Sequence, residues 1–492
     1  MSSSQIRSFR HTATVVALEV ETALCQVAAA VEKEAEILGR QREGERKRKA
    51  VHKSTAVREK DLDGKAAEVR KRRTILAEYI KEIVDGYVPC SSLRISMINA
   101  FSSVFVHRYR DLDQNIRAEC VKAMGSWFTH YPAHFLDGSY LRYVGWVLSD
   151  SSTHVRLEAV RALAVVYAQS EYVGSLTHFT ERFKPRLLEM AGGDTELSVR
   201  TAVIGVLSAI DSNALLEDEE RERICLLLFD AEVRVRKAVS PFVAGVWQEA
   251  ADERASAVVG RNKGEKVKSR AGVKALAMLL VKWGKALDRA SEAVEEESEA
   301  GDGPPSRRIH LPSSSGADPR GRIVLAVEAL WDEVDAVNDW ECILDVLLLD
   351  HSAGRDEDMD GPDSLVESAR NTVDPAWRLT EVEETVMLEV LVASLRRAKL
   401  SSTTGKKVRL ASLFALMPLL MVLSQDDEET VVSDLTRALI KGLPRLFIKY
   451  QTDENRISQV LLIPPLMNLD LYLEMRMMNV RRCRISVVSR YE

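Results

Sequence analysis

The stretch DLDQNIRAEC at residues 111–120 returns three times in related form, as DSSTHVRLEAV at 150–160, DTELSVRTAV at 194–203 and DAEVRVRKAV at 230–239. In each copy an aspartate stands six residues before an arginine, and an aliphatic residue precedes that arginine. The arginines are 39, 44 and 36 residues apart, which is the period of helix pairs that stack into a solenoid. The pattern predicts an all-α fold, an α-solenoid of HEAT-like helical repeats.

The spacing within each copy also predicts a ladder of contacts between neighbouring repeats. An aspartate that caps a helix accepts hydrogen bonds from the free backbone N–H groups of the first turn. An arginine about two turns later can reach the aspartate of the adjacent repeat. The expected ladder consists of Asp111, Arg117, Asp150, Arg156, Asp194, Arg200, Asp230 and Arg236.

The composition fits a folded helical protein. The chain has 492 residues, of which 46% are hydrophobic and 29% charged, while Gly (24) and Pro (14) are scarce. These proportions exclude wholesale disorder and favour helix. Six widely spaced cysteines without a CxxC pair indicate neither a disulfide framework nor a zinc site.

Targeting and membrane signals are missing from the sequence pattern. The first residues, MSSSQIRSFR, lack the apolar stretch of a signal peptide. The longest uncharged apolar run, residues 410–424, contains Pro418 and is shorter than the roughly 20 residues of a membrane span. We therefore expect a soluble intracellular protein.

Composition shifts along the chain predict five segments. Residues 1–100 form a long helical hairpin, in which polar residues around Gly64 separate two helical stretches. Repeats occupy 101–247, and 248–322 contain a basic loop, a helix ending near Arg289 and a disordered acidic and Pro/Ser/Gly-rich linker. Further helices follow at 323–480, with an acidic loop at 350–365, and the irregular tail 481–492 stops without a capping repeat. The chain is therefore expected to be truncated at its C-terminal end.

The hairpin carries a separated block of positive charge. Residues 40–73 hold 14 basic and 6 acidic residues, a local charge of +8 in a chain of net charge −6. Such a block indicates a local anionic partner, although a solvated helix face gives the same pattern. The candidate phosphate contacts are Arg46, Lys47, Arg48, Lys49, Lys53, Arg70, Lys71, Arg72, Arg73, Lys263, Lys266, Lys268 and Arg270.

The sequence contains no recognisable catalytic motif. No P-loop, HExxH or GxSxG occurs, and the carboxylate clusters fall in loops that cannot hold a fixed acid–base pair. We expect no enzyme activity, no cofactor and no metal.

Aromatic and basic residues gather between the first two repeats. Tyr109, Tyr143 and Trp146 share their neighbourhood with Arg108, Arg110 and Arg142. Such mixtures are typical of interface hot spots and of peptide-recognition surfaces. Most nearby aromatic residues, from Trp127 to Tyr140, are better explained as core residues that fill space between helices.

In this same region the sequence resembles the stromalin family, the SA or stromal-antigen subunits of cohesin. The segments VFVHRYRD, IRAEC, YPAHFLD, SYLRYVGWVLSD and VRLEAVRAL within 104–168 are similar to the family's stromalin conservative domain. Upstream, FRHTATVVALEVETALCQVA resembles its long hairpin, and downstream ALWDEVDAVNDWECILDVLLL and PRLFIKYQTDENRISQVLLIPPLMNLDLYLEMRM resemble its later helices.

The resemblance implies a non-catalytic, nuclear and chromatin-associated scaffold for sister chromatid cohesion and chromosome segregation. Its partners would be the cohesin kleisin subunit, through it the SMC heterodimer, and duplex DNA bound independently of sequence. Regulators with Phe-x-Phe or Tyr-x-Phe motifs would bind a surface anchored by Trp146 and Arg182, the positions that match the family motif, with Tyr109, Arg142, Tyr143 and Phe183 as neighbours. The resemblance implies neither a membrane nor a small-molecule substrate as partner. Since the family has further helices before and after the matching segments, it also implies that this chain is truncated at both ends. The alternative from the repeats alone is a generic HEAT-repeat adaptor, such as a nuclear transport or phosphatase scaffold.

Overall fold

The computed structural model describes residues 4–51, 56–85, 104–257, 264–299, 319–351, 373–413, 426–468 and 470–473. Within these ranges all regular secondary structure is helical, so the predicted all-α class is confirmed. The chain divides into two compact units, Met1–Arg221 and Glu222–Glu492. The five segment boundaries expected from composition remain predictions.

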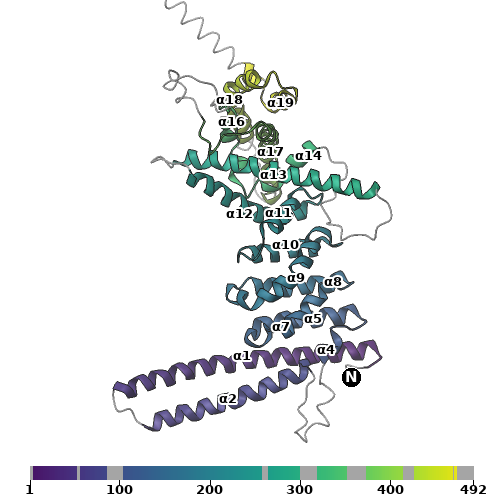
Figure 1. Cartoon of the computed structure of the whole chain (residues 1–492), viewed down its shortest axis with the longest axis vertical. Coiled ribbons are helices and arrows are strands. Elements are labelled where there is room, and N and C mark those ends of the chain that lie inside the picture. The colour runs from purple at the N-terminus through teal and green to yellow at the C-terminus, as the bar shows by residue number, and fades with distance from the viewer. Residues whose placement is uncertain are drawn as a thin grey trace, which may run out of the picture. The chain divides into compact units, whose positions relative to one another are not determined.

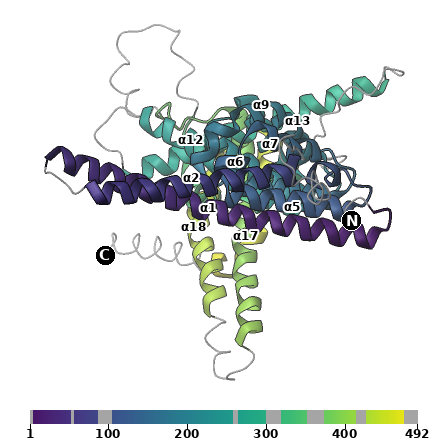
Figure 2. The ribbon, with the colours of Figure 1, turned by 90° about the horizontal axis from the view of Figure 1, so that it is seen from below.

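The first unit begins with the predicted long hairpin. Helices α1 (Arg7–Val51) and α2 (Ala56–Asp85) lie side by side (Figures 1 and 2). Their shared core contains Val31, Leu38, Leu62 and Val69, because apolar residues recur at helical spacing on both inner faces. One detail of the prediction was wrong: α2 already begins at Ala56, so Gly64 lies inside this helix and not in the turn.

Helix α1 is also a core helix of the first repeat. By length and hydropathy alone, a window within Arg7–Lys47 could cross a membrane, with a mean hydropathy of 1.6. In the structure this stretch buries Leu18 and Cys25, and the Trp127 indole Nε1 donates to the hydroxyl of Thr22 at 3.0 Å. Packing against α5 explains part of its apolar character, while Val16, Val20 and Val27 stay exposed.

The rest of the first unit consists of stacked helices. Helices α5, α8 and α10 carry the Asp–Arg pattern and stack on one another in that order (Figure 1). Trp127, Phe128, Tyr131, Phe135 and Tyr140 are buried, as predicted for core residues. The element bounds are α4 (Val104–Arg108), α5 (Gln114–His130), α6 (Pro132–Phe135), α7 (Gly138–Val147), α8 (Thr153–Tyr167), η1 (Ser170–Tyr172), α9 (Val173–Gly193) and α10 (Leu197–Asp211).

Arginine–aspartate pairs join consecutive repeats. Arg117 donates from Nε and Nη2 to the carboxylate of Asp150 at 2.7 and 2.8 Å. Arg156 makes the same bidentate contact with Asp194 at 2.7 and 2.8 Å, and the pairing raises the pKa of the Arg156 guanidinium. Arg10 of α1 reaches Asp111 at 2.9 Å, so the series starts one step earlier than the sequence pattern suggested.

Of the remaining ladder residues, Arg200 belongs to the first unit, and Asp230 and Arg236 belong to the second. Arg200 donates from Nε to the carbonyl of Ala191 at 2.9 Å within the first unit. Arg236, in the second, donates from Nη1 to the carbonyl of Asp230 at 2.7 Å. A contact between Arg200 and Asp230 would join the units and stays a prediction.

The predicted capping role of the aspartates was wrong in detail. The N-cap residues of α5, α8 and α10 are Asp113, Ser152 and Glu196. Each repeat aspartate lies two residues earlier and accepts the backbone N–H of that N-cap residue, at 2.8–3.0 Å. The arginine of the same repeat donates back to the aspartate's carbonyl, at 2.7 Å for Arg117 and 2.8 Å for Arg156. Thus the aspartate and arginine of one repeat stabilise the loop before its helix, and the arginine also binds the aspartate of the next repeat.

A buried carboxyl group makes the first unit sensitive to pH. Glu21 of α1 is fully buried, and its Oε2 has no hydrogen-bond partner among the described residues. Burial raises the pKa of Glu21 from 4.5 to about 8, and the hydrogen bond from Cys25 only partly opposes this. The folded chain therefore keeps a proton that the unfolded chain releases, and its stability falls as pH rises from 4.5 to about 8.

Replacing Glu21 with Gln is expected to raise the free energy of unfolding by about 3 kcal/mol at pH 7.5 and to change it little at pH 4. The amide keeps the shape of the protonated carboxyl group but cannot ionise. Urea unfolding at the two pH values measures the effect, and Glu19→Gln, at an exposed position of α1, is the matched control. An equal gain at both pH values would contradict the explanation.

The second unit is also helical, and α17 and α18 lie side by side in it (Figure 2). One prediction was wrong: α13 continues to Glu299, so the acidic run after Arg289 does not open a disordered segment. Most of the expected linker and acidic loop, and all of the tail 481–492, lie outside the described residues. The bounds are α11 (Asp218–Cys225), which spans the division, then η2 (Leu226–Phe229), α12 (Val233–Ala257), α13 (Glu265–Glu299), α14 (Pro319–Leu330), α15 (Asp335–Asn338), α16 (Trp340–Leu347), α17 (Glu381–Leu413), α18 (Asp426–Tyr450), α19 (Glu454–Val460) and η5 (Pro464–Leu466).

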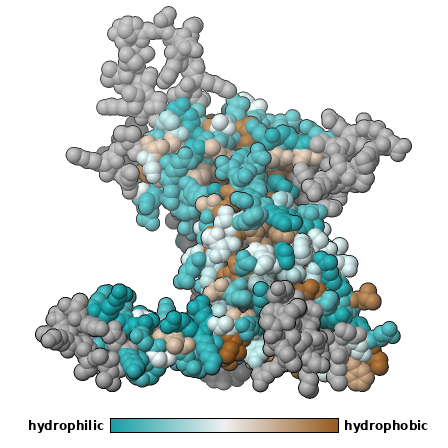
Figure 3. Space-filling view, turned by 60° about the horizontal axis from the view of Figure 1, so that its bottom comes forward, coloured by the Kyte–Doolittle hydropathy of each residue, from teal (hydrophilic) through white to brown (hydrophobic). Residues whose placement is uncertain are grey.

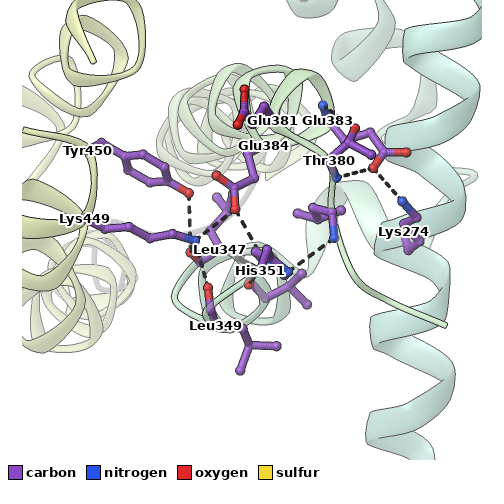
Figure 4. Close-up of polar contacts among 12 residues, drawn as sticks. Lys274, Leu347, Leu349, His351, Thr380, Glu381, Glu383, Glu384, Lys449 and Tyr450 are labelled. Carbon is purple, nitrogen blue, oxygen red and sulfur yellow. Dashed lines mark hydrogen bonds and ion pairs between the residues drawn. The ribbon is translucent and has the colours of Figure 1, made fainter. Parts of the chain in front are cut away.

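A network of buried polar contacts surrounds the C-terminal end of α16 (Figure 4). Lys449 donates to the carbonyls of Leu347 and Leu349 at 2.8 Å each and to Glu384 at 3.0 Å. His351 donates to the carbonyl of Val346 at 2.9 Å, and burial lowers the pKa of this imidazole. Free carbonyls at a helix C-terminus favour cations, so the network stabilises the join between α16, α17 and α18.

Candidate functional site

An exposed tryptophan between arginines lies on α7 of the first unit. The Trp146 side chain is 39% exposed, which is unusual for the largest apolar residue type. The guanidinium carbons of Arg110 and Arg142 lie 5.4 and 5.6 Å from its ring centroid. Two cations within about 6 Å of an indole are at the distance of cation–π contacts. The surface can therefore offer a ligand both a flat apolar face and hydrogen-bond donors.

Two of the predicted neighbours lie beneath this tryptophan. Tyr109 and Tyr143 are only 5% and 8% exposed, and their rings meet edge to face at 4.9 Å. The Tyr143 ring also meets Trp146 edge to face at 5.6 Å. Burial at the tyrosine ring raises the pKa of Tyr109. Because they are buried, these tyrosines support the exposed indole, and only their edges can meet a ligand.

The second predicted anchor comes from α9, which packs against α7. Arg182 is exposed and Phe183 is half-buried, and the Arg182 guanidinium carbon lies 5.5 Å from the Phe183 ring centroid. Phe183 in turn points its ring at Gly145, the residue before Trp146. The contact between Phe183 and Gly145 therefore places the two predicted anchors on adjoining helices.

Sequence analysis did not single out Gly145. It stands inside the apolar helix segment YVGW, where a glycine has no distinctive signal. Only the structure shows that a ring from α9 occupies the space where a side chain would be.

The basic residues of the hairpin lie on its solvent-exposed arm, which is largely hydrophilic on the face shown in Figure 3. Arg46, Lys47, Arg70, Lys71, Arg72 and Arg73 are exposed. Several are paired within the hairpin, Lys47 with Glu43 at 2.8 Å, Arg72 with Glu34 at 3.1 Å and Arg73 with Glu32 at 3.0 Å. Exposed pairs of this kind are weak, so these cations can exchange partners for phosphates. The side chains of Arg48 and Lys49, and all of Lys53, lie outside the described residues.

The second group of predicted phosphate contacts belongs to the second unit. Lys266 and Lys268 are exposed at the start of α13. Arg270 forms an ion pair with Asp345 at 3.4 Å and lies 6.0 Å from the Trp377 ring centroid, so it contributes to packing within the unit. Lys263 lies outside the described residues.

Three protein-family models match the chain. The STAG domain matches residues 1–63, the stromalin conservative domain 110–184, and the HEAT-repeats domain of cohesin subunit SCC3/SA 326–481. The chain belongs to the SCC3/SA family of cohesin subunits, the stromalins. The match at 110–184 contains Trp146, Arg182 and Phe183, so the candidate surface lies in the stromalin conservative domain.

Stromalins from distant organisms align with most of the chain. Cohesin subunit SA-1 of Xenopus laevis is 27% identical, covering 97% of this chain and 32% of its own length. Cohesin subunit SA-3 of Homo sapiens is 27% identical, with 96% and 32% covered. Cohesin subunit psc3 of Schizosaccharomyces pombe is 36% identical over 52% of this chain and 24% of its own length. The chain thus spans about a third or less of these relatives.

A solved stromalin structure shares the fold. The cohesin subunit Scc3 of Z. rouxii superposes with a TM-score of 0.60 at 19% identity, covering 100% of this chain and 47% of that one. The predicted HEAT-repeat solenoid is confirmed by this match and by the family model for the later helices. The stromalin family is one of non-catalytic structural subunits, and the transport or phosphatase adaptor has no support among these matches.

Proposed function

We propose that this chain is a non-catalytic scaffold portion of a cohesin subunit, acting in sister chromatid cohesion and chromosome segregation. Support comes from membership of the stromalin family, whose relatives are cohesin subunits. The proposed partners are the cohesin kleisin and, through it, the SMC heterodimer. The proposed location is chromatin in the nucleus.

The stromalin conservative domain would serve as a receptor for short aromatic motifs. The observation that carries this proposal is Trp146, 39% exposed between the guanidinium groups of Arg110 and Arg142. An aromatic ligand side chain would stack on the indole, and Arg182 would hold a carboxylate or carbonyl of the motif. Chromatin regulators with Phe-x-Phe or Tyr-x-Phe motifs are the proposed ligands.

Titration of the chain with a fluorescent Phe-x-Phe peptide tests the receptor. Saturable one-to-one binding is expected, together with loss of binding when both phenylalanines of the peptide are alanine. Equal binding of both peptides, or of neither, would contradict the proposed receptor.

The basic arm of the hairpin would bind the phosphates of duplex DNA without reading sequence. Its exposed arginines and lysines, including Arg46 and Lys47, are held mainly by weak pairs within the hairpin. Each neutralised phosphate contributes a salt dependence of roughly 0.9 log unit in affinity per tenfold change in salt. Binding should therefore weaken steeply as salt rises.

Replacing Arg46 and Lys47 with glutamate is expected to weaken duplex binding at least about tenfold. The slope of log affinity against log salt concentration should become shallower by about 1.8, the contribution of two phosphate contacts. Fluorescence anisotropy over a series of salt concentrations measures both quantities. The control reverses Lys122 and Arg161, which are exposed on α5 and α8 and make the same change in net charge. Equal effects of the two variants would show that total charge alone governs binding.

A further inference from the structure

Gly145 leaves no room for a side chain beside the ring of Phe183. A Cβ built on Gly145 would lie 2.3, 2.4 and 2.6 Å from Cζ, Cε2 and Cε1 of the Phe183 ring. The ring thus points its tip at the backbone of α7, one residue before Trp146. Alanine would be favoured over glycine inside a helix by about 1 kcal/mol, so the local sequence preference does not explain this glycine.

The Phe183 ring also packs against a second ring of α9. Its centroid lies 4.8 Å from that of Phe179, and Phe179 is itself buried. The guanidinium carbon of Arg182 lies 5.5 Å from the Phe183 centroid. A shift of Phe183 would therefore be transmitted to Arg182.

The segment of α9 around Phe183 is also fixed to the end of α7. Arg186 donates from Nε and Nη2 to the carbonyl of Leu148 at 3.3 and 3.2 Å, and Leu148 is the C-cap residue of α7. Lys184 forms an ion pair with Glu220 at 2.6 Å and donates to the carbonyl of Leu215 at 3.2 Å. Helix α9 cannot slide as a body without loss of these bonds.

We infer that Gly145 is a positioning residue: because it has no side chain, Phe183 can lie against α7, and this holds Arg182 beside the helix that carries Trp146. This inference rests on the proposed receptor function. A methyl group at position 145 would need a shift of about 1 Å to reach ordinary contact, and recognition sites tolerate misplacement of only about 0.5 Å. The site therefore depends on a residue that touches no ligand.

Peptide titration of Gly145→Ala and of a matched control variant tests the inference. Gly145→Ala is expected to weaken Phe-x-Phe binding at least tenfold, because the new methyl group displaces Phe183 and with it Arg182. Gly205→Ala is the control, since Gly205 lies inside α10 with nothing within 4 Å of a built Cβ, and it should change affinity less than twofold. A general loss of stability would instead lower the thermal unfolding midpoint of the variant, which is measured alongside the titration.

A rescue variant keeps the test decisive if Gly145→Ala folds poorly. Phe183→Leu removes the ring atoms that the new methyl group would meet. In that background Gly145→Ala should cost less than threefold in affinity, with folding checked by circular dichroism.

The outcomes separate the inference from the function on which it rests. A wild-type chain that binds while Gly145→Ala binds equally well overturns the inference alone, as does a tenfold loss that persists in the Phe183→Leu background. A folded wild-type chain that does not bind the Phe-x-Phe peptide contradicts the proposed receptor and the inference together.

Discussion

Replacing Arg156 with methionine is expected to lower the free energy of unfolding of the first unit by about 3–5 kcal/mol. The Arg156 side chain is 9% exposed and its partner Asp194 only 2% exposed. The guanidinium makes two bonds to that carboxylate at 2.7 and 2.8 Å, and two to the carbonyls of Asp150 and Ser151 at 2.8 and 3.2 Å. Methionine keeps the apolar stem but leaves a buried carboxylate without its cation.

The matched control is Arg161→Met on the same helix. Arg161 is 61% exposed and pairs with Glu158 at 2.6 Å, and exposed pairs contribute at most about 1 kcal/mol. Urea denaturation followed by circular dichroism gives both free energies. Equal losses for the two variants would contradict the view that the arginine–aspartate pairs hold the repeats together.

Replacing Trp146 with alanine is expected to weaken Phe-x-Phe peptide binding about 100-fold while the helical content stays unchanged. Tryptophan anchors at the centre of an interface typically contribute 2 kcal/mol or more. The fold should survive because the Trp146 side chain is 39% exposed, whereas the tyrosines below it are buried. Isothermal titration calorimetry measures the affinity, and the thermal unfolding midpoint reports the fold.

Two further variants define the role of the indole. Trp146→Phe retains a ring and should restore part of the affinity. Trp377→Ala removes a tryptophan of the second unit that also lies near an arginine, Arg270, and should leave binding unchanged. Loss of peptide binding together with loss of the fold in Trp146→Ala would show that this residue belongs to the core.

The solenoid was predictable because each repeat carries the same few residues at the same spacing. An aspartate, an aliphatic residue and an arginine recur at the period of a helix pair, and Arg117 and Arg156 do reach the aspartates of the following repeats. The exact role of the aspartate was not predictable. An aspartate that caps the helix and an aspartate two residues before the N-cap both fit the six-residue spacing to the arginine. Only the backbone geometry distinguishes the two roles.

The candidate surface was predictable in composition but not in layout. Tyr143 and Trp146 are three residues apart on α7 and lie on the same face of the helix, so helical spacing alone does not tell which is buried and which is exposed. The role of Gly145 depends on Phe183, a residue 38 positions away on another helix. The network around Glu384 likewise joins residues of separate helices whose sequence neighbourhoods show no shared pattern.

The most direct test of the scaffold proposal is co-purification of this 492-residue chain with the middle segment of a cohesin kleisin, with the mass of the complex measured by light scattering. The account predicts a stable one-to-one complex. A chain that is folded by circular dichroism and forms no complex with the kleisin segment would contradict it.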